Sequence, residues 1–113
     1  MNYTAKQISE IVDGQLIGHE NVKIKNIAFD SRNIFSAKNV AFIALNTEHN
    51  SGEKYIASAI EKGVKLIISE KIKEPVPNIS YIIVKNSLHA LQQLATYHFQ
   101  NHHLKTIGIT GVS

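Results

Sequence analysis

Apolar residues recur along this chain with two different periods, and together these periods predict strands interleaved with helices. Helical spacing predicts helices at 4–13, 53–62 and about 86–100. Short apolar or alternating runs predict strands at 16–17, 22–29, 39–45, 64–69, 81–84 and 106–109. Strands that alternate with helices are typical of an α/β domain. We therefore expect a small mixed sheet with flanking helices.

Residues at the predicted helix ends support these boundaries. Thr4 and Gln7 have the spacing of a capping box, in which each side chain accepts the other residue's backbone N–H. Gly14 and Gly63 follow the first two helices, and we expect each to be a left-handed C-terminal cap. Asn86, or the serine after it, is expected to cap the third helix.

The central part of the chain has the pattern of a βαβ unit. The run 39–45 is continuously apolar, which indicates a strand that is covered on both faces. With the second helix and strand 64–69 it would form two parallel strands joined by a right-handed crossover. We place a domain boundary near 84–86, giving a domain at 1–84 and, at 85–113, a linker helix and the first strand of a further domain.

Composition excludes several classes of function. The 113 residues carry a net charge of only +3, and the lysines are scattered among acids, so we expect no nucleic-acid partner. The absence of cysteine excludes disulfides, zinc–thiolate sites and thiol nucleophiles. The N-terminus does not resemble a signal peptide, and no apolar run approaches a membrane span of about 20 residues. We therefore expect a cytoplasmic protein with no membrane partner.

Polar residues follow the predicted strand 22–29. Arg32 is the only arginine of the chain, and its planar guanidinium suits bidentate contact with phosphate or carboxylate. Ser31 adds a hydroxyl and a backbone N–H, at a strand end where α/β folds place ligands. The alternative is a surface turn in which Asp30 caps the turn and pairs with Arg32.

Two further segments are candidates for ligand contact. In the loop 44–52, Asn46, Asn50 and Ser51 offer hydrogen bonds to a base or sugar, although Asn50 or Ser51 also suits a helix N-cap. The segment 106–113 is a strand that runs into a glycine-containing turn, as phosphate-binding loops do, or an ordinary strand and turn.

Histidines do not suggest a metal site. His98 and His102 have metal-compatible helical spacing, but no carboxylate or thiol lies near enough in sequence to complete a site. Solvated histidines at a helix end explain them better. We therefore expect no bound metal.

Taken together, an ordered set of motifs resembles the start of the Mur ligases, and it covers nearly the whole chain. The motifs are 29–32, 40–45, 50–56, 59–64 and 107–111. The resemblance implies an N-terminal domain that binds the UDP part of a UDP-N-acetylmuramoyl-peptide and is cut off where its ATP-binding loop begins. The implied UDP contacts are Ser31, Arg32, Leu45, Asn46, Asn50 and Gly52. The implied start of the ATP loop is Thr110, Gly111 and Ser113.

The family resemblance also implies a reaction for the whole protein. ATP and Mg²⁺, bound by a central domain, would activate the peptide carboxylate as an acyl phosphate, which D-Ala-D-Ala would attack to extend the tripeptide of a cell-wall precursor. The present chain alone would be inactive and would hold neither cofactor. In some members of the family this ligase is fused to an alanine racemase, and the fragment is compatible with such a fusion. Alternatives are the related ligase that adds the third peptide residue and a non-enzymatic α/β interaction module.

The chain departs from the family pattern at two places. Leu45-Asn46-Thr47 stands where the family usually has Leu-Lys-Gly, and Ser51-Gly52-Glu53 stands where it often has Asp-Gly-His. These changes remove a cation and an imidazole, and they add an acid beside a proposed anion site.

Overall fold

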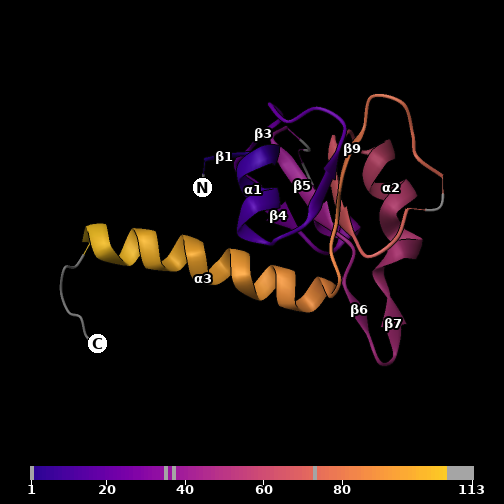
Figure 1. The fold of residues 1–113 in the computed structure, drawn as a ribbon. Coiled ribbons are helices and arrows are strands. Elements are labelled where there is room, and N and C mark those ends of the chain that lie inside the picture. The colour runs from indigo at the N-terminus through magenta and orange to yellow at the C-terminus, as the bar shows by residue number, and fades with distance from the viewer. Residues whose placement is uncertain (1, 35, 37, 73, 107–113) are drawn as a thin grey trace.

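A five-stranded mixed sheet forms the centre of the computed structural model, which describes residues 2–34, 36, 38–72 and 74–106 (Figure 1). The strand order is β2-β9-β8-β5-β4. Neighbouring strands are parallel from β4 to β9, whereas β2 is antiparallel to β9. The α/β prediction is confirmed. The bounds are β2 Gln15–Ile17, β4 Asn26–Ala28, β5 Val40–Ile43, β8 Leu66–Ser69 and β9 Ser80–Ile83.

Helices cover both faces of this sheet. Helix α1 (Ala5–Ile11) and the first part of α3 (Ser87–Thr106) lie on one face, and α2 (Ile56–Glu61) lies on the other (Figure 1). Because successive strand residues point to opposite faces, β5 supplies both cores: Ile43 packs with α1 and α3, and Phe42 packs with α2. The predicted doubly covered strand and the β5–α2–β8 unit with parallel strands are therefore confirmed.

The N-terminal caps of α1 and α3 are the ones that the sequence predicted. Thr4 Oγ1 accepts the Gln7 N–H at 3.2 Å, and Gln7 Oε1 accepts the Thr4 N–H at 2.9 Å, so the capping box is confirmed. At α3, Asn86 Oδ1 accepts the His89 N–H at 2.8 Å, which confirms Asn86 as the cap.

The end of α1 differs from the prediction, because the left-handed residue is Asp13 (φ 53°) and not Gly14. Glycine is needed at position 14 for a steric reason, because a Cβ there would lie only 2.6 Å from Cγ2 of the buried Ile82. Gly63, with φ 103°, adopts the left-handed conformation that was expected after the second helix.

The predicted single strand 22–29 is wrong, because the chain changes sheets within it. Strand β3 (Lys23–Ile24) pairs with β1 (Tyr3–Thr4) in a separate two-stranded sheet, whereas β4 joins the main sheet. The break falls at Lys25, whose N–H donates to Asn39 O at 2.7 Å, and the same carbonyl also accepts the Asn26 N–H at 3.2 Å. Because its N–H is bonded to this shared acceptor, Lys25 belongs neither to the β1–β3 pair nor to the β4–β5 pair.

The segment predicted as a plain loop at 46–52 contains a β-hairpin that projects from the body (Figure 1). The hairpin is formed by β6 (Asn46–Thr47) and β7 (Asn50–Ser51). A 3-10 turn, η2 (Gly52–Tyr55), follows it, so the helix predicted at 53–62 is α-helical only over α2.

Helix α3 is longer than the predicted 86–100 and continues to Thr106, because its 20 residues include neither glycine nor proline. Thr106, predicted to begin a last strand, is therefore helical, and 107–109 lie outside the described residues. Among the helices of the described residues, none is long and apolar enough to cross a membrane.

Candidate substrate-binding site

The carboxyl ends of β4, β5, β8 and β9 lie along one edge of the sheet, because these strands are parallel. Ligands of open α/β sheets bind outside this edge. The predicted residues Ser31 and Arg32 follow β4, and Leu45 and Asn46 follow the neighbouring strand β5. The fold therefore places both groups at the edge where a ligand is expected.

The turn after β4 is organised by an ion pair. Asp30 Oδ1 accepts the backbone N–H of Arg32 at 2.9 Å and its Nε–H at 3.1 Å, and Oδ2 accepts Nη2–H at 2.9 Å. These hydrogen bonds hold the pKa of Asp30 below its ordinary value and raise the pKa of Arg32. The structure thus has the paired surface turn that the sequence allowed as the alternative. The Arg32 side chain is 83% exposed, so an anion could still reach it.

A second cation lies beside this turn, and sequence reasoning missed it. Lys62, which follows α2, donates from Nζ to the backbone carbonyl of Ser31. Its charge also contributes to the lowered pKa of Asp30. Ser31 itself is only 2% exposed and begins the 3-10 turn η1 (Ser31–Asn33), so its backbone and not its hydroxyl forms the observed contact. Nothing local in the sequence places Lys62 next to Ser31, because the contact depends on how α2 packs.

A shallow hollow of about 350 Å³ opens along β4, next to the ion pair. Asp30, Ile34 and the 59% exposed Phe29 contribute to its lining. The turn after β4 therefore combines two cations, a carboxylate and an accessible apolar surface.

Asn46 is the centre of a second cluster, at the ends of β5 and β8. Its Nδ2 donates to Glu70 Oε1 at 2.9 Å and to Glu53 Oε2 at 3.3 Å. Its Oδ1 accepts from Ser51 Oγ at 2.9 Å, across the hairpin. The Asn46 side chain is therefore held by partners from the protein, with both its donor and its acceptor engaged.

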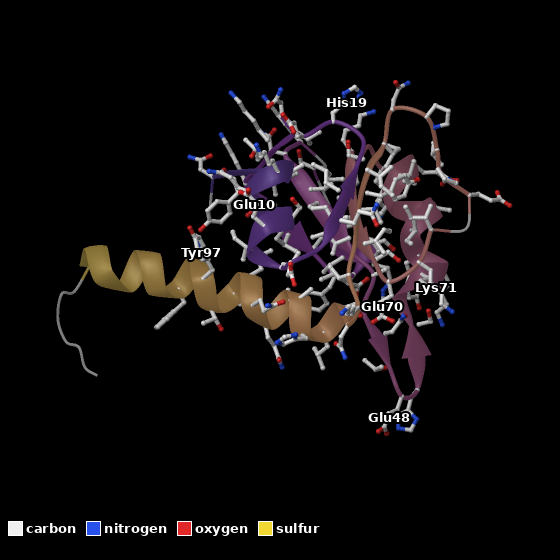
Figure 2. All side chains as sticks on the ribbon, viewed as in Figure 1. Glu10, His19, Glu48, Glu70, Lys71 and Tyr97 are labelled. Atoms are coloured by element: carbon white, nitrogen blue, oxygen red, sulfur yellow. The ribbon has the colours of Figure 1, made fainter. Side chains whose placement is uncertain are left out.

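The start of α3 joins the same cluster. Ser87 N–H donates to Glu70 Oε2 at 2.7 Å, and Ser87 Oγ accepts the backbone N–H of Asn46 at 2.9 Å. Figure 2 shows Glu70 between the start of α3 and the base of the hairpin. Burial raises the pKa of Glu70, but the hydrogen bonds from Ser87 and Asn46 outweigh burial, so its pKa lies below the ordinary value. Glu70 is thus held as a carboxylate.

Leu45 and Gly52 shape the base of the hairpin through their backbones. The Gly52 N–H donates to Leu45 O at 2.7 Å, and a Cβ on Gly52 would lie 2.6 Å from Leu45 N. Only glycine permits this approach. Asn50 pairs with Thr47 in the hairpin register.

The structure therefore divides the predicted UDP contacts between two clusters on neighbouring strands. The partners of Ser31 and Arg32 are Asp30 and Lys62, whereas those of Asn46 come from the hairpin, η2, β8 and α3. Glu70 and Ser87 are the residues of the second cluster that sequence reasoning missed.

The predicted ATP contacts Thr110, Gly111 and Ser113 lie outside the described residues. Within the described part of the chain, no three His, Cys, Asp or Glu side chains are grouped to hold a metal ion.

Comparison with known proteins identifies the class of protein that has this fold. The chain is 42% identical, over 87% of its length, to UDP-N-acetylmuramoyl-L-alanyl-D-glutamate–2,6-diaminopimelate ligase of Clostridium tetani. It is 33% identical, over 96% of its length, to UDP-N-acetylmuramoyl-tripeptide–D-alanyl-D-alanine ligase of Bacillus subtilis. The chain belongs to the Mur ligases and corresponds to their N-terminal domain.

A particular member of this family shares the fold in a solved structure. The crystal structure of MurF from Acinetobacter baumannii matches 89% of the chain with a TM-score of 0.75 and 27% identity. The chain spans 22% of that structure, and 21% and 24% of the two relatives above. No family model matches the chain.

Proposed function

We propose that this chain binds the UDP part of a UDP-N-acetylmuramoyl-peptide as the N-terminal domain of a longer ligase. The observation that carries the proposal is that the relatives differ in the residue they add but are all named for UDP-N-acetylmuramoyl substrates. The segment shared with this chain is only a fifth to a quarter of each relative. Recognition of the shared part of the substrate is the simplest role for a shared domain.

The turn after β4 supports contact with the diphosphate. Arg32 and Lys62 bring two cations to the carboxyl edge of the sheet, and Arg32 is exposed. Arginine forms charge-assisted, bidentate hydrogen bonds with phosphate. In this proposal a diphosphate competes with Asp30 for the guanidinium, and the rest of the UDP is contacted by residues in and next to the hairpin, namely Leu45, Asn46, Asn50 and Gly52.

For the complete protein we propose ATP- and Mg²⁺-dependent addition of D-Ala-D-Ala to the UDP-N-acetylmuramoyl-tripeptide, in peptidoglycan precursor synthesis. The MurF fold match and the Bacillus subtilis relative support this choice. The second candidate is addition of diaminopimelate as the third residue, which the 42% identity to the Clostridium tetani ligase favours.

Titration of the chain with UDP, followed by amide NMR shifts, tests the binding proposal. We expect shifts at 31–32 and 46–52. Arg32→Ala should weaken binding by roughly tenfold or more, since it removes a charged hydrogen bond. Lys38→Ala is the matched control, because Lys38 precedes β5 and lies at the opposite edge of the sheet. Equal losses in the two variants would show non-specific attraction and contradict the assignment.

The complete protein decides between the two ligases. ADP release is measured with UDP-N-acetylmuramoyl-tripeptide plus D-Ala-D-Ala, and separately with the UDP-N-acetylmuramoyl-dipeptide plus diaminopimelate. We expect turnover with the first pair. Turnover with the second pair alone would assign the chain to the third-residue ligase, and the absence of both would overturn the ligase proposal.

A further inference from the structure

We propose that Glu70 is a positioning residue that couples the β6–β7 hairpin to the start of α3. The hairpin carries part of the proposed UDP site, so the consequence for ligand binding rests on the function proposed above. The coupling itself rests on four hydrogen bonds among Asn46, Glu70, Ser51 and Ser87.

The two oxygens of Glu70 serve two different elements. Oε1 accepts from the Asn46 side chain of β6, and Oε2 accepts from the Ser87 backbone at the first residue of α3. The bond to Ser87, at 2.7 Å, brings a carboxylate to the positive end of a 20-residue helix. A displacement of either element therefore disturbs a hydrogen bond to the same carboxylate.

Ser87 closes this arrangement into a ring. Its Oγ accepts the Asn46 N–H at 2.9 Å, so the hairpin contacts α3 directly as well as through Glu70. Ser87 is fully buried, and Glu70 is half-buried directly after strand β8. Charged hydrogen bonds in such surroundings are stronger than exposed ones. The base of the hairpin and the first turn of α3 are thus expected to move together.

The length of α3 gives this coupling a consequence. At 20 residues it is about 30 Å long, and its far end projects beyond the sheet (Figure 1). Because the helix is stiff, a small tilt at Ser87 becomes a larger displacement at the far end. A ligand that shifts the position of the hairpin would therefore shift the far end of α3 as well.

Glu70→Gln is the appropriate perturbation. It preserves the shape of the side chain but replaces one acceptor oxygen by an NH₂ group, which then faces the N–H of either Asn46 or Ser87. Glu74→Gln is the matched control, with the same change of charge at an exposed site in the loop after β8. Ser87→Ala removes the hydroxyl that accepts the Asn46 N–H and that also hydrogen-bonds Glu70, but it leaves the backbone bond from residue 87 to Glu70 in place. It provides a second variant if Glu70→Gln does not fold.

The first measurement needs no ligand. Hydrogen exchange and amide NMR shifts are compared for the wild-type chain and the variants. In Glu70→Gln we expect shift changes in both 46–52 and 87–90, whichever way the new NH₂ group faces. Where it faces Ser87, exchange of the Ser87 amide should accelerate roughly tenfold or more. Ser87→Ala should likewise perturb both segments, and Glu74→Gln neither. Changes confined to residues next to position 70 in the sequence, with none in 46–52 or 87–90, would overturn the coupling.

The second measurement adds UDP. In the wild type we expect UDP-induced shifts to extend from the hairpin to 87–90. In Glu70→Gln we expect the shifts at 87–90 to be much smaller than in the wild type, because only the direct bond between Asn46 and Ser87 still joins the two elements. Identical propagation in both proteins would refute Glu70 as the connection. If UDP produces no shifts in the wild type, the proposed function fails, and the ligand-free exchange experiment alone decides whether Glu70 couples the two elements.

Discussion

Helix α3 provides the sharpest test of how the domain is built. The sequence predicts a boundary near 84–86, with the helix as a linker, and that boundary stays a prediction. In the structure, however, Leu94 is 1% exposed and belongs to the same core as Ile8 of α1. If α3 is part of the domain, Leu94→Ala must lower the free energy of unfolding by a core-sized amount. If it is only a linker, the substitution must have almost no effect.

The magnitude follows from burial. Removing three buried carbons from Leu94 costs about 2.4 kcal/mol of transfer free energy, and the cavity that remains brings the loss to about 2–5 kcal/mol. Leu88 lies on the same helix but is 44% exposed. The same substitution there removes about half as much buried surface and leaves no closed cavity, so we expect a loss of about 1 kcal/mol.

Urea unfolding followed by helical circular dichroism measures both variants, because the expected losses are smaller than the typical stability of a domain, about 5–15 kcal/mol. The result that supports docking is a loss that is larger for Leu94→Ala than for Leu88→Ala by about 1 kcal/mol or more. Equal losses, within about 0.5 kcal/mol, would refute the packing of α3 against the sheet.

Two further predictions concern the hairpin. Gly52→Ala places a Cβ against the Leu45 backbone and weakens the 2.7 Å hydrogen bond, so it should destabilise the chain by about 2–4 kcal/mol in urea unfolding; a loss under about 1 kcal/mol would contradict the close approach. Because the folded-state pKa of Glu70 is lowered, its contribution to stability is present above about pH 4.5 and is lost as the pH falls through the folded pKa. Wild type and Glu70→Gln should therefore differ in urea midpoint at neutral pH and converge in acid, and a pH-independent difference would contradict this.

Features that depend on neighbours in sequence were the predictable ones. The apolar run 39–45 predicted a strand covered on both faces, because burial on both sides demands apolar residues at every position. The capping box at Thr4 and Gln7 was predictable because both partners lie within one helical turn.

Features that depend on partners far away in the sequence were not predictable. The break at Lys25 requires the carbonyl of Asn39, which the fold brings back beside it. Likewise, Glu70 gains its partners only when β5, β8 and α3 are assembled, and Lys62 reaches Ser31 only because α2 packs over the sheet. For the candidate site, the sequence predicted that both groups follow strand ends, as they do in the structure, but not the contacts that each group makes.

The two departures from the pattern that the family resemblance implies meet in one contact. Asn46 stands where the family usually has lysine, Glu53 stands where it often has histidine, and in this chain the Asn46 amide donates to the Glu53 carboxylate at 3.3 Å. A lysine here would bring a charge to the hairpin, whereas asparagine bridges Glu53 and Glu70 without one. Arg32 in the turn after β4 and Lys62 beside it then supply positive charge near the proposed diphosphate, and Lys71 lies near Glu70 in the second cluster. Arg32 should therefore matter more to UDP binding in this chain than in relatives that keep the lysine, and restoring it with Asn46→Lys should reduce the loss caused by Arg32→Ala.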